Sequence, residues 1–185
     1  MTVADRYQEL WARLHDLRDV WLGLRLTVRE DRPPGEATLL VERVDDEIDD
    51  GLATLDDALG AIGGALDEPD DVRAGGRALA LAHGRSADVA AAYWQGVGSP
   101  ERRNELRSLA RRHGRDWAAW ARSVDDALQR VPVALTAVDR ELGHAWAELV
   151  ERAASGSTLL SAHSIGQQIN VPGRPARRGI GERGR

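Results

Sequence analysis

Residues 99–153 read SPERRNELRSLARRHGRDWAAWARSVDDALQRVPVALTAVDRELGHAWAELVERA, and this segment carries the strongest structural signal in the chain. It begins with a strong helix start, because Ser99 can cap free backbone N–H groups and Pro100 fits the first helical position. Apolar side chains then recur about every 3.6 residues, the period of a straight α-helix. This stripe consists of Leu106, Ala110, His113, Trp117, Trp120, Val124, Leu128, Val131, Leu135, Val138, Leu142, Trp146 and Leu149.

Pro132 lies inside this stripe. It removes the N–H that would bond the carbonyl of Leu128, although the apolar phase continues across it. One rod built from residues 99–153 would span roughly 80 Å, which a compact body of this size cannot cover. We therefore expect a break or sharp kink within residues 130–133, and then a helix that ends at about Ala153.

Three helices are predicted to precede this segment. The first covers residues 3–29, where apolar residues alternate in steps of three and four, as in a coiled coil. Two prolines and a glycine in residues 32–35 then allow the chain to reverse into a helix over about 36–66. Acidic residues near position 70 start a third helix, over about 70–97, built mainly of Ala and Gly. The first stripe contains Tyr7, Leu10, Leu14, Leu17, Trp21, Leu24 and Val28.

The regular spacing stops at Ser155. Residues 155–158 read SGST and predict a linker, and the chain from Pro172 onward is predicted to be disordered. We therefore predict an all-α fold, an up-and-down bundle of four to five long antiparallel helices over residues 2–154. Residues 155–185 are predicted to form a disordered, flexible, basic C-terminal tail.

Composition limits the classes of function. Cysteine is absent, which excludes disulfides and thiolate metal sites. No apolar run of about 18 residues and no secretory signal is visible, so we expect a cytoplasmic protein without a membrane span. The chain carries a net charge of −5. Since residues 155–185 carry five Arg and one Glu, residues 1–154 carry −9 and would repel nucleic acid over most of their surface.

Two short motifs bear on metal chemistry. Residues 45–49 read DDEID and match the DDxxD motif with which prenyl-transferring enzymes hold Mg²⁺ against a diphosphate. Residues 141–144 read ELGH and match the Glu-x-x-His unit of di-iron bundles, which need that unit twice. A second copy is missing in both cases. We interpret the first motif as a solvated acidic helix face and the second as a polar helix edge.

The remaining candidates for chemistry are single residues. His113 lies on the apolar stripe, where a lone histidine is more often satisfied by a carbonyl group than catalytic. The spacing of Trp21, Trp117, Trp120 and Trp146 predicts core packing, which leaves Trp11 and Trp94 as the exposed candidates. No nucleophile motif or phosphate loop is present, so we expect no catalytic residue, no cofactor and no metal.

Charge is segregated between two of the predicted helices. The helix over about 36–66 is rich in Asp and Glu, and the segment after Ser99 is rich in Arg. This opposition suggests that the two helices face one another, within the bundle or across a homodimer. Acidic residues between the arginines argue against nucleic acid as the partner. These arginines are Arg102, Arg103, Arg107, Arg111, Arg112 and Arg115.

The tail contains a modestly apolar, nearly uncharged segment, residues 159–171. Such a segment, attached through a flexible linker, can become ordered when it binds a partner, by strand addition or by insertion into a groove. We predict a non-enzymatic interaction module that binds another protein through this segment. One alternative is a client or cargo protein whose tail is an address or cleavage site for a partner shell or protease. Another is a metal- or diphosphate-binding helical-bundle enzyme. The candidate partner-binding residues are Leu159, Leu160, Ile165, Gln167, Gln168, Ile169 and Val171.

Overall fold

The computed structural model describes residues 1–34 and 38–168, with side chains described for residues 1–34 and 39–156. This part of the chain is helical and contains no strand, which confirms the all-α prediction. The elements are α1 (Val3–Arg29), α2 (Thr38–Asp67), α3 (Val72–Ala92), the π-helical turn η1 (Tyr93–Val97), α4 (Pro100–His113), α5 (Arg115–Leu128) and α6 (Val131–Gln168).

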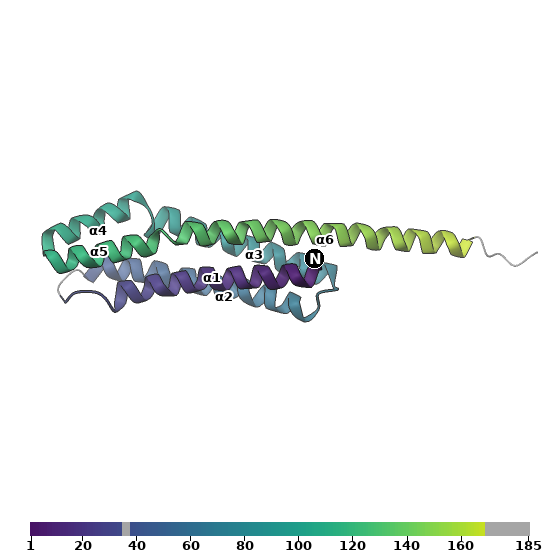
Figure 1. Ribbon diagram of the computed structural model, residues 1–185, viewed down its shortest axis with the longest axis horizontal. Coiled ribbons are helices and arrows are strands. Elements are labelled where there is room, and N and C mark those ends of the chain that lie inside the picture. Colours follow the sequence, from purple (N-terminus) through teal and green to yellow (C-terminus); the bar gives the residue numbers. More distant parts are fainter. Residues whose placement is uncertain (35–37, 169–185) are drawn as a thin grey trace, which may run out of the picture.

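Four long helices form the body of the bundle (Figure 1). α1 and α3 each pack against both α2 and α6, so every helix of this set has two neighbours. α5 packs on α1 at the end where α1 finishes, and α4 packs on the outside of α5. Short connections join these antiparallel neighbours, as the up-and-down prediction requires.

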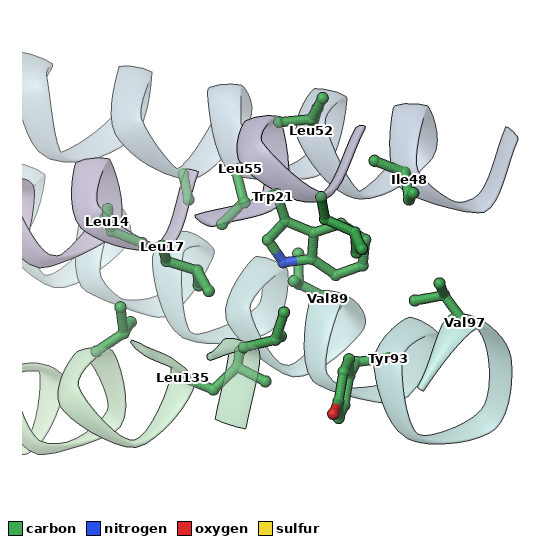
Figure 2. Packing of buried hydrophobic residues seen from close by; sticks show 14 of the residues in the cluster. Leu14, Leu17, Trp21, Ile48, Leu52, Leu55, Val89, Tyr93, Val97 and Leu135 are labelled. Carbon is green, nitrogen blue, oxygen red and sulfur yellow. The ribbon is translucent and has the colours of Figure 1, made fainter. Parts of the chain in front are cut away.

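α1 supplies the centre of the core. Thr2 and Asp5 form the predicted capping box, in which the Asp5 N–H donates to Thr2 Oγ1 at 3.1 Å and the Thr2 N–H donates to Asp5 Oδ2 at 2.7 Å. The predicted stripe from Tyr7 to Val28 is buried throughout, and Trp21 is fully enclosed among Leu17, Leu55 and other apolar side chains (Figure 2). Burial of each such side chain stabilises the fold by about 1.5–3 kcal/mol.

Two glycines allow the large aromatic residues of α1 to approach neighbouring helices. A Cβ at Gly51 of α2 would lie 3.2 Å from the Trp21 ring, and a Cβ at Gly75 of α3 would overlap the Tyr7 hydroxyl. Helix α3 is therefore one of small residues, as predicted, and it buries Gly75, Ala78 and Ala82 against its neighbours.

The helix predicted from Ser99 to about position 130 is in fact two helices. Gly114 has φ +96° and ψ −164°, a backbone conformation open essentially to glycine, and it reverses the chain between α4 and α5. As a result His113 is exposed at the end of α4 instead of lying on a continuous stripe. The break expected within residues 130–133 is confirmed, because α5 ends at Leu128 and Pro132 lies in the first turn of α6.

Helix α6 does not end near Ala153, as the spacing predicted, but continues to Gln168. The expected linker residues include Ser155, whose Oγ donates to the Glu151 carbonyl at 2.9 Å, so the hydroxyl is satisfied within the helix. Gly156 costs only about 1 kcal/mol relative to Ala in a helix. Residues 169–185, the remainder of the predicted tail, lie outside the described residues.

Candidate functional site

The C-terminal part of α6 extends away from the rest of the bundle. Leu149 is the last buried side chain of the described part of α6, Val150 is 61% exposed, and residues 153–156 are exposed. Figure 1 shows the helix running past the start of α1 and then alone beyond the other helices. The backbone of this segment has no other helix beside it in that view.

The predicted partner-binding residues lie on this extension or beyond it. Leu159, Leu160, Ile165, Gln167 and Gln168 belong to the last turns of α6, and their side chains are not among those described. Ile169 and Val171 lie outside the described residues. We name residues 155–168 the α6 extension.

The two ends of the DDxxD motif share a helix face, as predicted, but the partners on that face are arginines of α1. Arg29 Nε donates to both carboxylate oxygens of Asp45 at 2.6 and 2.7 Å, and Arg29 Nη2 donates to Asp49 Oδ2 at 2.7 Å. Arg25 Nε lies 2.9 Å from Asp49 Oδ1. Asp45 and Asp49 therefore form an ion-pair network between α1 and α2, while Asp46 of the same motif is exposed, as a solvated face requires.

Glu141 is the buried carboxylate of the Glu-x-x-His motif, with a side chain only 7% exposed. Its oxygens lie 3.1 Å from His144 Nδ1, 3.0 Å from Arg140 Nε and 3.9 Å from Arg6 Nη1 of α1. Burial acts to raise the pKa of Glu141, but hydrogen bonds from His144 and Arg140 outweigh it and hold that pKa below its ordinary value. Glu141 therefore approaches α1 through Arg6, while His144 and Arg140 are 48% and 60% exposed and form the predicted polar edge.

A second polar junction joins η1, α4 and α5. The hydroxyl of the buried Tyr93 donates to the Leu128 carbonyl at 2.9 Å and accepts from Arg103 Nη2 at 2.8 Å. A Cβ at Gly98 would overlap the Tyr93 ring, so glycine is required where the chain leaves η1. The signal that could have revealed this junction is the sequence Gly96-Val97-Gly98 next to a tyrosine, because paired glycines mark a close backbone approach.

The predicted contact between the acidic and basic helices accounts for only a small part of the ion pairs that α2 forms. Arg102 of α4 pairs with Glu47 of α2 at 2.6 Å. Other acids of α2 pair elsewhere, as Asp56 does with Arg18 at 2.6 Å and Asp57 with Arg85 at 3.1 Å. Most of the acidic residues of α2 that form ion pairs therefore do so with α1 and α3 rather than with α4.

The tryptophans are placed largely as their spacing predicted. Trp21, Trp117 and Trp120 are buried, and Trp94 is 56% exposed. Trp120 Nε1 donates to the Thr27 carbonyl at 3.0 Å, which fastens α5 to the last turn of α1. Trp146 and Trp11 are partly buried against the core. His113 lies with its ring centroid 5.6 Å from that of Trp117.

Comparison of the chain with protein-family models, with curated proteins and with solved structures finds no match. Among the helices of the described part of the chain, none is both long enough and apolar enough to cross a lipid bilayer. The same residues contain no group of three or more His, Asp or Glu side chains placed to hold a metal ion.

Proposed function

We propose that this protein is a non-enzymatic interaction module, in which the helical bundle is a folded base and the α6 extension binds a partner protein. The observation that carries the proposal is the course of α6. Leu149 is its last buried side chain among those described, Arg152 still pairs with Asp70 ahead of α3, and the helix then continues to Gln168 beyond the other helices (Figure 1). A helix that projects from a folded domain can be recognised by a partner that receives its apolar face in a groove.

The sequence of the extension supports this role. Residues 155–168 carry no Asp, Glu, Lys or Arg, whereas the preceding turns of α6 carry several charged residues. Leu159, Leu160 and Ile165 give the segment apolar character. The segment is too short, however, to be a core helix of its own. Apolar side chains of this kind provide most of the binding free energy when a helix enters a groove on a partner.

The contacts of the two acidic motifs also favour a non-enzymatic role. Asp45 and Asp49 are occupied by arginines of α1, and Glu141 is occupied by Arg140, His144 and Arg6. Both clusters tie helices together within the bundle. Their contacts give them a structural role that is independent of any ligand.

The proposal is tested by affinity capture from a lysate of the source organism, followed by mass spectrometry. The baits are the full chain, a chain ending at Ala154, and the double variant Leu160→Asp/Ile165→Asp. The control bait is Leu39→Asp, which introduces one such negative charge at a residue that is 78% exposed on α2.

We expect the full chain and the control to recover the same protein, and the other two baits to lose it by about tenfold or more. Equal recovery of that protein with the chain that ends at Ala154 would remove the α6 extension from the function.

A further inference from the structure

The α4–α5 hairpin carries a groove on its outer side. Its lining includes three alanines, Ala110, Ala118 and Ala121, and its volume is about 510 Å³. Alanine side chains allow another helix to approach closely, because they add little bulk to the surface. The polar residues that line the groove are Asn104, Arg107, Arg111, Arg122 and Asp125.

Two of these arginines have no carboxylate partner within the described residues. Arg111 is exposed and bonds only the Arg107 carbonyl, at 3.4 Å, and Ser108 Oγ, at 3.3 Å. Arg122 is also exposed and forms no ion pair with any described residue. Asp125, the acid in the groove, is already shared by Arg103 at 3.8 Å and Arg107 at 3.4 Å. The groove therefore presents excess positive charge on a small-residue floor.

The opposite pattern appears on the outer face of α2. Glu42, Asp46 and Asp50 are exposed, lie four residues apart, and form no ion pair with any described residue. The same helix face continues with the exposed Ala53 and Gly60, which also add little bulk. The neighbouring acids of α2 are those that pair with α1 and α3.

The two surfaces match in spacing as well as in charge. Asp46 and Asp50 are separated by one helical turn, and so are Arg107 and Arg111, which gives about 6 Å along each helix axis. In a single chain neither surface covers the other, because both are open. We propose that the groove of one copy binds the outer face of α2 of a second copy.

A contact of this kind is head-to-tail, since it joins two different surfaces. Each copy keeps one free groove and one free acidic face, so association continues beyond the dimer unless the rotation closes a ring. Ion pairs that remain partly exposed are weakened by salt. Self-association should therefore be weak, dependent on concentration, and reduced at high ionic strength.

The test is sedimentation equilibrium of the full chain from about 10 µM to about 500 µM, at about 50 mM and about 500 mM salt. The groove variant is Arg111→Glu/Arg122→Glu, and the face variant is Asp46→Arg/Asp50→Arg. The matched control is Arg112→Glu/Arg115→Glu, which reverses two charges on the same hairpin outside the groove. Far-UV circular dichroism checks that each variant keeps its helical content.

We expect the wild-type mass to rise with concentration at low salt, and association to weaken by about tenfold or more in the groove and face variants but not in the control. A mixture of the groove and face variants should form a heterodimer, because it contains one intact groove and one intact face.

A wild-type chain that stays monomeric throughout would overturn the proposal. Equal weakening of association in the control variant would also overturn it, because the effect would then arise from the change in net charge and not from the groove. Loss of binding to a labelled duplex oligonucleotide in the groove variant of a monomeric chain would assign the groove to nucleic acid instead.

Discussion

At the scale of single residues, two buried tyrosines differ in what surrounds the hydroxyl group. The Tyr7 hydroxyl has no hydrogen-bond partner among the described residues, while the Tyr93 hydroxyl bonds both Leu128 and Arg103. A buried polar group without a partner costs free energy, and a paired one contributes a net stabilisation. The same substitution should therefore have different effects at the two positions.

We expect Tyr93→Phe to lower the free energy of unfolding by about 1–2 kcal/mol and to leave the Leu128 carbonyl without its donor. Tyr7→Phe should be neutral or should raise that free energy by up to about 1 kcal/mol, because it removes only an unsatisfied hydroxyl. Urea unfolding monitored by circular dichroism measures both values. Equal losses of stability in the two variants would contradict the assigned contacts.

Glu141 makes stability depend on pH in a predictable direction. Because its pKa is held below the ordinary value of 4.5 in the folded chain, its ion pairs stabilise the fold above that value. This stabilisation disappears as the pH falls through the folded pKa. We expect Glu141→Gln to destabilise the bundle by about 1–3 kcal/mol at neutral pH.

The difference between wild type and Glu141→Gln should shrink as the pH falls through the lowered pKa of Glu141, because the wild-type carboxylate is then protonated as well. Urea unfolding of both proteins at several pH values measures this difference. Glu148→Gln, on a partly exposed residue of the same helix, serves as the control for loss of one negative charge. A difference that does not shrink at any acidic pH at which both proteins remain folded would show that Glu141 acts through packing alone.

The sequence predicted correctly which side chains are buried in the core. It predicted poorly which charged side chains pair with one another. The burial of Tyr7, Trp21 and Leu135 follows from helical spacing, since one face of each helix must face the others. The partners of Asp45 and Asp49 depend on how α2 is rotated against α1. Spacing along one helix contains no information on that rotation.

At the scale of elements, the turn at Gly114 separates two helices that the spacing joined. Its φ of +96° is the only positive φ among the described residues. A side chain at this position is strained by roughly 1–3 kcal/mol, because L-residues rarely adopt this backbone conformation. The α4–α5 hairpin therefore depends on glycine at one position.

We expect Gly114→Ala to lower the free energy of unfolding by about 1–3 kcal/mol. The matched control is Gly143→Ala, in an exposed part of α6 with open space around the new Cβ, which should raise stability by up to about 1 kcal/mol. Thermal and urea unfolding measure the sign of the stability change in each variant. A stabilising effect at Gly114 would mean that α4 and α5 form one continuous helix in solution.

The sequence could not place this turn for a physical reason. A single glycine is tolerated inside a helix at a cost of about 1 kcal/mol, and the apolar period runs through Gly114 without a shift. Reversal is favoured only because α4 packs against α5, with Arg103 and Arg107 beside Asp125. The break at 129–130 was predictable, since Pro132 cannot continue a hydrogen-bonded helix.

At the scale of the whole molecule, the described structure has two parts with different surroundings. Residues from Val3 to Leu149 contribute to one continuous core, which includes side chains of every helix. The α6 extension begins after the last of these residues and meets no other helix. The sequence predicted a boundary between bundle and tail near position 154. It did not predict that helix α6 would continue across this boundary.

The function was less accessible from the sequence than the fold. Apolar residues at 159–171 indicate a segment that differs from its neighbours in charge, but a partner is specified by shapes and charges that lie on another molecule. The continuation of α6 past residue 154 was not predictable, because residues 155–158 are typical of a linker.

The central claim is that the bundle folds without the α6 extension, which leaves that extension free to bind. Its most direct test is the free energy of unfolding in urea of the full chain and of a chain ending at Ala154, measured side by side. We expect the two values to agree within about 0.5 kcal/mol, because every core residue of the described chain lies before residue 155. A loss of more than about 2 kcal/mol on truncation would show that the extension belongs to the core and would contradict the proposed function.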